Sequence, residues 1–384
     1  MAKNSTGDTL ESLQGDAPRA GTSISRIAAW SHNTRCPTAS AAFAARVDLD
    51  KLLAETEYAP SVGESPFMRQ RGQLFEHRVR EDGYRDLVAI LRSQLGFDRD
   101  VVVPLNLKNK YSPNEDGLKK RAEETRKWMG KVLKEDPDAA DLIEGAVLPL
   151  HLGSYTAYFE ADGIGVRTGP IVHGIEMKSW PQVDGRVDDP AKASEALRQL
   201  GFYLYLLRNV VSSLGGDPAL VSDSGLLVTP RNVGLVPVGG VRDLAREIAL
   251  AEAVVDRLPR ASGYSVITAT GMSFGSAAPS GGDPPTRLGH LAALTSELGT
   301  HYQTSCISSC GLARFCRARR HEAGDAAVCG TNVVRFLPGV TSLGRAAELA
   351  SGAAPTDDEL RSGAPEVLSR AGALYSQRRP ARRA

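Results

Sequence analysis

Residues 155–182, YTAYFEADGIGVRTGPIVHGIEMKSWPQ, decide the fold of this chain, together with the helical run EALRQLGFYLYLL that follows at 195–207. Apolar and polar residues alternate on both sides of the Gly169-Pro170 turn, a pattern typical of a β-hairpin. We therefore predict one strand from Tyr155 to Phe159 and a second from Ile171 to Ile175, paired with each other.

Three charged side chains follow these two strands. Alternate residues of a strand share a face, so Glu176 and Lys178 should point the same way while Met177 points into the core. Pairing of the hairpin would bring Asp162 beside them. Two carboxylates suit Mg²⁺ or Mn²⁺, and a nearby lysine can orient water and stabilise charge on a phosphate. The trio therefore predicts metal-assisted phosphodiester hydrolysis, although Glu-x-Lys alone is also found in exposed salt bridges.

The combination of these residues with Gln199 and Tyr203, four apart on the next helix, resembles the RecB-type branch of the PD-(D/E)XK nucleases. The match covers residues 66–240. The resemblance implies an α/β fold with a central mixed sheet flanked by helices, an acid on the second core strand, E-x-K on the third and Q-x-x-x-Y on the helix after it. It further implies that Gln199 helps to position Lys178 or the water and that Tyr203 buttresses the site. The alternative is that Gln199 and Tyr203 are ordinary half-exposed helix residues.

Two details differ from the family's pattern. The family often places Gly before its first acid, whereas here Ala161 precedes Asp162. Its first helix often carries G-x-x-x-H, with the His on the metal. Counting from Gly72 reaches Glu76, and His77 is one residue late. We expect Glu76 to be the supporting metal ligand, with the Met177 carbonyl as another, and His77 to be solvated or merely hydrogen-bonded rather than a ligand.

The elements around this stretch are expected in the order strand, strand, strand, helix, strand. A helix should begin at Ser65-Pro66, where a hydroxyl N-cap precedes Pro. Residues 97–107 are expected to be extended and 115–132 to form a charged amphipathic helix. EGAVLPLHLG, at 144–153, is expected to be the first strand of the catalytic sheet.

Composition and the resemblance together divide the chain into five parts. These are a disordered N-terminus at 1–22, an N-terminal segment with Cys36 at 23–64, the nuclease core at 65–260, a linker and Cys-rich metal region at 261–345, and a C-terminal basic tail at 346–384.

Charge and hydropathy exclude several classes of protein. The formal net charge is +1, so any surface for nucleic acid must be a local patch. No apolar run approaches the length of a membrane helix, and the N-terminus lacks the features of a secretion signal, which predicts a cytoplasmic protein. Five cysteines, an odd number, favour metal or redox use over a disulfide framework.

Three of these cysteines, Cys306, Cys310 and Cys316, fall within eleven residues. Such thiolates bind zinc or an iron–sulfur cluster, and either Cys36 or Cys329 could be the fourth ligand. The layout resembles iron–sulfur members of the same nucleases, the CRISPR-associated and AddB-type exonucleases, which place one cysteine before the core and three after it. The resemblance implies a structural [4Fe–4S] cluster on Cys36 and the three downstream cysteines, with zinc as the alternative. The C-x3-C-x5-C spacing here has one residue more than the family's usual C-x2-C-x5-C.

A basic patch lies beside these cysteines, formed by Arg314, Arg317, Arg319 and Arg320, and we expect it to track a phosphate backbone. The sequence as a whole predicts an Mg/Mn-dependent DNA nuclease acting on single strands or duplex ends, in repair, recombination or phage defence. The competing hypothesis is a non-cleaving nucleic-acid-binding or scaffold subunit with a structural Fe–S or Zn cluster. No GxxxxGK[ST] phosphate loop occurs, so unwinding would require a helicase or defence-complex partner.

Overall fold

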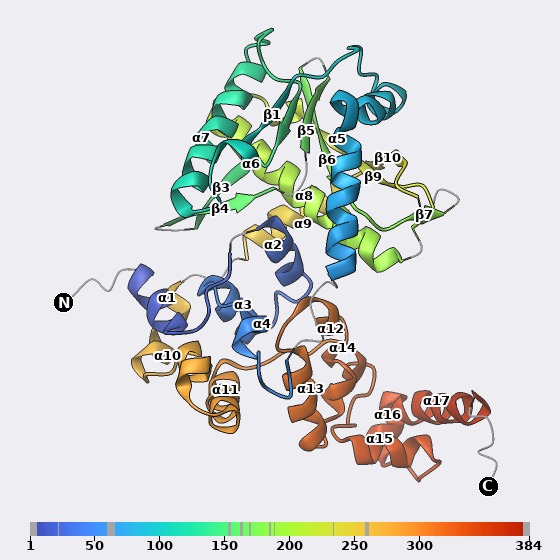
Figure 1. Cartoon of the computed structure of the whole chain (residues 1–384). Helices are drawn as coiled ribbons and strands as arrows, with labels where there is room; N and C mark the ends of the chain where they lie inside the picture. Colours follow the sequence, from blue (N-terminus) through green and yellow to red (C-terminus); the bar gives the residue numbers. More distant parts are fainter. Residues whose placement is uncertain are drawn as a thin grey trace. The chain divides into compact units, whose positions relative to one another are not determined.

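The structure is a computed structural model of a mixed α/β protein, which confirms the predicted α/β class (Figure 1). It describes residues 6–21, 23–59, 66–152, 155–161, 164–168, 170–183, 186–187, 189–232, 234–257 and 261–378. The chain forms two compact units. Unit 1 comprises residues 1–7, 20–31 and 62–262, and unit 2 comprises residues 8–19, 32–61 and 263–384.

Unit 1 is built on a six-stranded mixed sheet with the order β1-β2-β5-β6-β9-β10. Its strands are β1 (Pro104–Asn106), β2 (Leu142–Glu144), β5 (Ile164–Thr168), β6 (Ile171–Met177), β9 (Val221–Pro230) and β10 (Pro237–Asp243). The run β2, β5, β6 is antiparallel, whereas β9 lies parallel to β6. A parallel neighbour requires a crossover connection, and the helix α8 (Pro190–Ser213) provides it.

The hairpin predicted from the sequence has a different first strand in the structure. β6 pairs with β5, in the register Ile164↔Ile175, on either side of the expected turn. The segment Tyr155–Glu160, which we expected to pair with β6, is β4 and pairs with β3 (Val147–Leu152) in a separate two-stranded sheet. β3 is therefore not the first strand of the main sheet either. Alternation shows that a segment is a strand, but it does not select the partner, because every half-buried strand has the same period.

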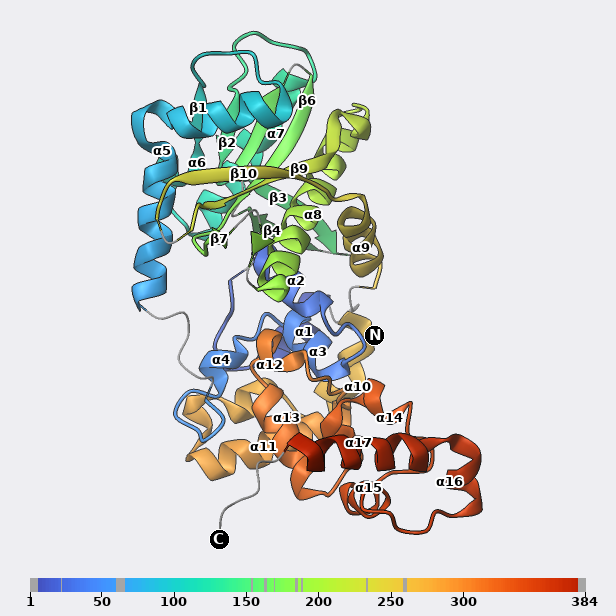
Figure 2. The same cartoon turned by 90° about the vertical axis from the view of Figure 1, so that its right-hand side faces the viewer.

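The long helix α5 (Pro66–Leu95) covers one face of the sheet, as Figure 2 shows. Its backbone leaves helical geometry at residues 81–84, so that α5 consists of two helical arms joined at a kink. The buried side chains on both arms of α5 pack against β6 and β9 in one apolar cluster, which includes Phe75, Val79, Leu87, Leu91, Ile175, Leu226 and Val228.

Helix α8 covers the opposite face, where three glycines form a row across three strands. Gly165 on β5 pairs with Gly174 on β6, which in turn pairs with Gly225 on β9. A Cβ at Gly165 would lie 2.6 Å from the Tyr203 hydroxyl, and a Cβ at Gly174 would lie 2.6 Å from Leu200 Cδ1. This glycine row therefore allows α8 to pack directly on the backbone of the sheet.

The remaining elements of unit 1 complete the layers around this sheet. They are α2 (Ile24–Ser31), α6 (Leu107–Lys110), α7 (Glu115–Val132), β7 (Gln182–Val183), β8 (Arg186–Val187), η1 (Pro218–Leu220) and α9 (Ala245–Val255). The charged helix predicted at 115–132 agrees with α7, whose N-cap Asn114 accepts a hydrogen bond from the Gly117 N–H. In the stretch 97–107, which was expected to be extended, the strand β1 covers Pro104–Asn106 and Leu107 begins α6.

Unit 2 is helical and has its own apolar core, with Leu52, Phe274, Leu291, Leu294 and Phe315 among its buried residues. Its helices, two of which begin at the unit boundary, are α1 (Thr6–Gln14), α3 (Pro37–Ala44), α4 (Leu49–Leu52), η2 (Ala261–Tyr264), α10 (Ser265–Ala269), η3 (Phe274–Ala277), η4 (Pro279–Gly281), α11 (Pro284–Leu298), α12 (Cys306–Ser309), α13 (Ala313–Glu322), η5 (Ala326–Cys329), α14 (Thr331–Val334), α15 (Leu343–Ala350), α16 (Asp357–Ser362) and α17 (Ala364–Arg378).

Two predicted boundaries differ from these units. The stretch 1–22, expected to be disordered, contains α1, whose Leu13 is fully buried in the core of unit 2. The predicted segment 23–64 is divided, because α2 belongs to unit 1 while residues 32–61 belong to unit 2. The weak periodicity of 1–22 misled the prediction, since a short helix can be held by tertiary packing alone.

Candidate functional site: the end of β6 and a four-cysteine cluster

Two charged side chains of the E-x-K motif meet at the end of β6. Glu176 is buried, with 3% of its surface exposed. Lys178 follows the strand, and its backbone N–H continues the parallel ladder by donating to the Val228 carbonyl at 3.0 Å. Its Nζ lies 2.8 Å from Glu176 Oε1. The two side chains therefore share one face of the sheet, as alternate strand residues should.

That face is the one covered by α8. Gly174, two residues before Glu176, packs against Leu200 and Tyr203 of the helix, whereas Ile175 belongs to the cluster under α5 and Met177 packs against it. The acid and the amine thus point toward α8, and the Met177 side chain points toward the opposite layer.

Gln199 extends the pair from the strand to the helix. The Lys178 Nζ donates to Gln199 Oε1 at 2.9 Å, and Gln199 Nε2 lies 3.4 Å from Glu195 Oε1. Gln199 is itself buried, with 6% exposed. The Lys178 ammonium is therefore held between a strand carboxylate and a helix amide, in an orientation fixed by both elements.

Tyr203, one turn further along α8, lies beneath this contact. Tyr203 is 2% exposed, and its hydroxyl has no hydrogen-bond partner among the described residues. Burial raises the pKa of this phenol, so it stays neutral and can only donate or accept a hydrogen bond. Tyr203 packs against Gly165 and Gly174. Among the described residues, its hydroxyl makes no hydrogen bond to the charged atoms of Lys178.

The first predicted acid, Asp162, lies outside the described residues. The structure describes the flanking strands β4 and β5. Ala161, the residue before Asp162, is fully buried, and its N–H donates to the Ala146 carbonyl at 2.8 Å.

Helix α5 passes the end of β6 at Arg71 and Gly72. Arg71 Nε donates to the Ser179 carbonyl at 3.0 Å, and a Cβ at Gly72 would lie 3.8 Å from Ser179 Oγ. Glu76 follows one turn later, and its Oε2 accepts a hydrogen bond from Arg80 Nη2 at 3.1 Å. His77 is exposed and pairs with Glu81 on its own helix, at 3.3 Å.

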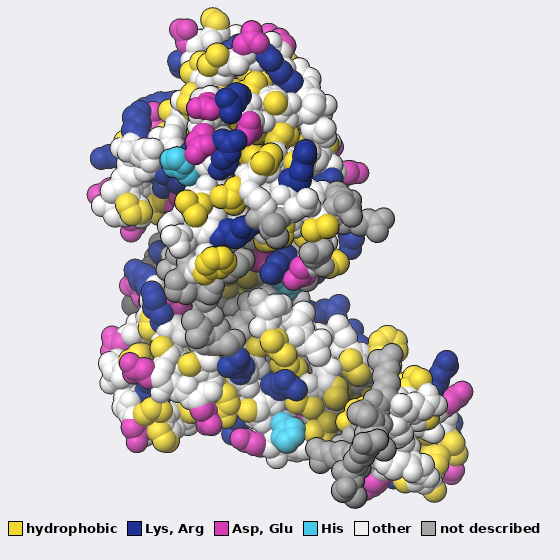
Figure 3. All heavy atoms as spheres, turned by 45° about the vertical axis from the view of Figure 1, so that its right-hand side comes forward, with side chains coloured by type: hydrophobic (Ala, Val, Ile, Leu, Met, Phe, Trp, Pro, Cys, Tyr) yellow, Lys and Arg dark blue, Asp and Glu magenta, His cyan; other side chains and the backbone are white. Residues whose placement is uncertain are grey.

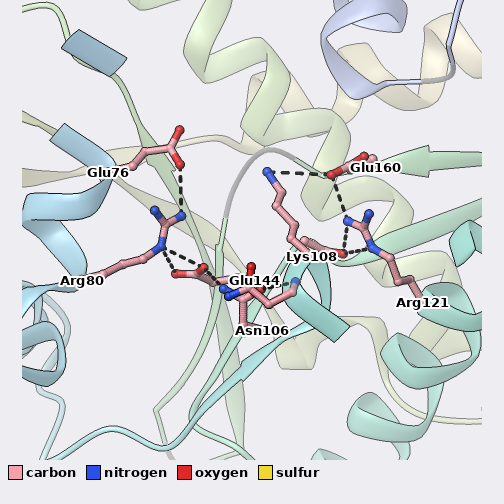
Figure 4. Close-up of polar contacts among 9 residues, drawn as sticks. Glu76, Arg80, Asn106, Lys108, Arg121, Glu144 and Glu160 are labelled. Atoms are coloured by element: carbon pink, nitrogen blue, oxygen red, sulfur yellow. Dashed lines mark hydrogen bonds and ion pairs between the residues drawn. The ribbon is translucent and has the colours of Figure 1, made fainter. Parts of the chain in front are cut away.

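Arg80 is held by a buried acid, Glu144, which was not among the residues predicted from the sequence. Glu144 ends β2 and is 2% exposed, and both its oxygens accept from Arg80 Nε, at 3.2 and 3.1 Å. Asn106 Nδ2 also donates to it, at 2.8 Å (Figure 4). Tyr84 Oη is a further donor, at 2.9 Å. A buried carboxylate requires such compensation. Its signal in the sequence was an acid ending an apolar strand.

A buried arginine lies on the neighbouring side of the same segment. Arg121 of α7 is 2% exposed and donates through Nε and Nη2 to the Gly145 carbonyl, at 3.0 and 2.6 Å. Its Nη2 also lies 2.9 Å from Glu160 Oε1, and Lys108 Nζ lies 3.8 Å from the same oxygen. Figure 4 shows Arg80 and Arg121 on either side of the strand end at Glu144. These contacts connect α5, α7 and β4 to β2.

The four predicted cluster cysteines all belong to unit 2. Cys36 is the N-cap residue of α3, Cys306 begins α12, Cys310 follows α12, and Cys316 lies on α13. The three downstream cysteines share an apolar cluster with Tyr302 and Ala313. Cys329, at the end of η5, is exposed.

Burial and repulsion between neighbouring thiolates raise the pKa of three of these thiols. Burial raises the pKa of Cys36, and it raises the pKa of Cys316 to about 12, with thiolates at Cys36 and Cys306 adding to the effect. The pKa of Cys310 is raised by the same causes. Nearby thiols that influence one another are a suitable donor set for a thiolate-bound metal group, whose positive charge would offset this cost. Within the described ranges, no three His, Cys, Asp or Glu side chains are grouped closely enough to hold one metal ion.

The arginines predicted to bind nucleic acid lie on α13. Arg314, Arg317 and Arg319 are exposed, whereas Arg320 is half-buried. Arg320 pairs with Asp325 at 2.5 Å and donates to the Thr300 carbonyl at 3.1 Å. Arg320 is thus engaged within unit 2. Elsewhere, basic and acidic side chains are interspersed on the face shown in Figure 3, in keeping with the net charge of +1.

Comparisons with known proteins add no relative: no protein-family model, curated protein or solved structure matches this chain. Among the helices of the described residues, none is both long and apolar enough to cross a membrane.

Proposed function

We propose that this protein is a metal-dependent deoxyribonuclease of the kind that the RecB-type PD-(D/E)XK resemblance implies. The observation that carries the proposal is the contact of Lys178 with both Glu176 and Gln199, at 2.8 and 2.9 Å. Three positions of a sequence motif, up to 23 residues apart in the chain, meet in one charged cluster at a strand end. A coincidental Glu-x-Lys would have no reason to engage the glutamine of the motif on the next helix.

The connectivity of the main sheet supports the same proposal. The expected core has the order strand, strand, strand, helix, strand. In the main sheet, β2, β5 and β6 are antiparallel neighbours, α8 comes later in the chain, and β9 lies parallel to β6. E-x-K then lies at the end of β6 and Q-x-x-x-Y on the crossover helix α8.

Glu176 and Asp162 are the proposed ligands of Mg²⁺ or Mn²⁺, with the Met177 carbonyl and Glu76 in support. The donors suit such an ion, because hard cations prefer carboxylate and carbonyl oxygens. When bound, the ion would neutralise charge on the phosphate and lower the pKa of water. Glu76 keeps one oxygen, Oε1, outside its contact with Arg80, so its pairing does not block this role.

Lys178 has the task of orienting the hydrolytic water and stabilising charge on the phosphate. Gln199 limits the rotation of its ammonium, and a fixed cation stabilises developing charge without reorganising during the reaction. Water forms the new bond to phosphorus while the bridging P–O bond of DNA breaks. Tyr203 supports the helix behind Gln199.

Cys36, Cys306, Cys310 and Cys316 are proposed to hold a structural [4Fe–4S] cluster, with zinc as the alternative. The chemistry of this donor set supports the proposal, because Cys36 and Cys306 are buried, Cys310 and Cys316 are half-buried, and the three downstream cysteines share one apolar cluster. Burial raises the pKa of Cys36, and backbone hydrogen bonds from His301, Ala39 and Thr38 partly offset this rise. A bound group would tie α3 to α12 and α13, which are about 270 residues apart in the chain.

Single-stranded DNA or duplex ends are the proposed substrate, with Arg314, Arg317 and Arg319 on the phosphate backbone. Arg320 is a weaker candidate, because it pairs with Asp325. Cytoplasmic location and a helicase or defence-complex partner belong to the same proposal.

Substitution of Lys178 tests the activity directly. We expect Lys178→Ala to reduce cleavage of labelled single-stranded DNA with Mn²⁺ by at least about 100-fold, in line with the loss of one electrostatic stabiliser. Glu176→Gln and Asp162→Asn should do the same. Lys119→Ala is the matched control, because Lys119 pairs with Glu115 on the outer surface of α7.

The same assay separates the competing hypothesis. A scaffold subunit would bind DNA in an anisotropy measurement while showing no cleavage that depends on Lys178. Equal cleavage by the wild type and all three site variants would overturn the nuclease proposal.

A further inference from the structure

Asn33 makes a contact that neither the nuclease motif nor the cysteine pattern contains. Its Nδ2 lies 3.2 Å from Cys306 Sγ and 2.5 Å from the His301 carbonyl oxygen. Asn33 lies in the turn between α2 and α3, three residues before Cys36, whereas Cys306 is 273 residues further along the chain. One amide therefore connects the segment of the upstream cysteine to a sulfur of the downstream group.

The orientation of this amide follows from its neighbours. A carbonyl oxygen can only accept a hydrogen bond, so the atom 2.5 Å from the His301 carbonyl must be the donor nitrogen. The other end, Oδ1, lies 3.1 Å from His301 Nδ1. Turning the amide over would place two oxygens against each other. The N–H that points at Cys306 is therefore fixed by His301.

His301 holds Asn33 at two points, because its carbonyl oxygen accepts from Asn33 Nδ2 and its ring Nδ1 lies 3.1 Å from Asn33 Oδ1. The amide of Asn33 thus directs an N–H dipole at one of the four cysteines. Asn33 and His301 are both partly buried, and the thiols lie in an apolar cluster, where a dipole acts more strongly than in water.

We infer that Asn33 is a positioning residue for the Cys306 sulfur, and that its amide raises the reduction potential of an iron–sulfur cluster held by Cys36, Cys306, Cys310 and Cys316. The inference rests on the cluster part of the proposed function, and it does not depend on nuclease activity. A reduced cluster carries one more negative charge than the oxidised form. A donor at a ligand sulfur stabilises the more negative form more strongly, so the potential rises.

The experiment is a redox titration of anaerobically reconstituted full-length protein, followed by electron paramagnetic resonance of the reduced cluster. Asn33→Leu keeps the approximate shape and removes the donor, and Asn33→Asp replaces the donor with a carboxylate. The matched control is Asn332→Asp, which places the same charge on an exposed position of the same unit. Iron and zinc content and visible absorbance are measured on each protein first.

We expect the ratio of reduced to oxidised cluster at a fixed potential to fall about tenfold in Asn33→Leu, equivalent to about 59 mV for one electron. Asn33→Asp should shift further, and Asn332→Asp should match the wild type. Iron-loaded variants with an unchanged potential would overturn the role of Asn33 and leave the cluster proposal standing. Wild-type protein without iron would overturn both.

A measurement on the wild type covers the case in which the Asn33 variants fail to assemble a cluster. Protein labelled with ¹⁵N in asparagine side chains should show hyperfine coupling between one amide nitrogen and the reduced cluster. No asparagine coupling in iron-loaded wild-type protein would contradict the inference, whatever the variants do.

Discussion

Two buried tyrosines of unit 1 differ in what their hydroxyl groups contact. Tyr84 donates to the buried carboxylate of Glu144 at 2.9 Å. The Tyr203 hydroxyl is buried as well, yet it has no hydrogen-bond partner among the residues that the structure describes. The two residues therefore form a matched pair, in which the same chemical change should have opposite consequences.

We expect Tyr203→Phe to leave the free energy of unfolding unchanged or to raise it by about 1–2 kcal/mol, because an unsatisfied buried hydroxyl is destabilising. Tyr84→Phe should lower it by about 1–3 kcal/mol, because Glu144 would lose a donor while staying buried. Urea unfolding of both variants measures the difference. A loss of more than about 1 kcal/mol in Tyr203→Phe would show that the hydroxyl has a partner in solution.

Residues that the sequence could and could not identify differ in how local their contacts are. Glu176 and Lys178 are alternate strand residues, and Gln199 was expected to help position Lys178, so their proximity follows from the motif. Glu144 depends on donors from Arg80, Tyr84 and Asn106, which lie 38 to 64 residues away. Composition and periodicity contain no information about such distant partners.

Among the elements, α8 depends most on the glycine row of Gly165, Gly174 and Gly225. These residues lie in register on three strands, and side chains there would meet Leu200 or Tyr203. Glycine normally weakens a strand, so its presence at three paired positions indicates that a close approach of the helix is favoured over strand propensity.

We expect Gly174→Ala to lower the free energy of unfolding by about 1–3 kcal/mol, since the new methyl group would lie 2.6 Å from Leu200 Cδ1. Gly130→Ala on α7 is the control. Among the described residues, no atom outside the adjoining backbone of α7 lies within 4 Å of its added Cβ, so it should keep or raise stability by up to about 1 kcal/mol. Urea unfolding compares the two, and equal stability would show that α8 can move away at no cost.

The elements also show where sequence reasoning fails. The helices α7 and α8 follow from their apolar periodicity. The strands β4 and β5 were predicted less well, because β4 has the alternation expected of a β6 partner but pairs with β3 instead. Pairing depends on which faces are buried by other elements, and a pattern of period two is the same for every candidate partner.

At the scale of the whole molecule, the two candidate centres lie in different units. Glu176, Lys178 and Gln199 belong to unit 1, whereas Cys36 and the three downstream cysteines belong to unit 2. Each unit has its own apolar core. The chain crosses between units several times, because residues 8–19 and 32–61 belong with residues 263–384.

Removal of the proposed cluster should therefore destabilise unit 2 and leave unit 1 protected. We expect iron removal by oxidation and chelation to increase amide hydrogen exchange in residues 32–59 and 299–334, because the metal ligation that joins these segments is lost. Peptides from 164–183 and 189–230 should keep their protection. Exchange measured by mass spectrometry tests this, with Mn²⁺ present throughout. An equal loss of protection in both sets would contradict it.

The glycine row also bears on how natural variation in this chain would be interpreted. Gln199 reaches Lys178 from α8, and the three glycines of the row set how closely α8 packs on the sheet. A variant that enlarges one of them could be well folded and keep every polar group of the motif, yet carry the glutamine out of reach of the amine. Such a protein would keep every residue of the motif. It would still lose the proposed activity, because α8 would be displaced from the sheet.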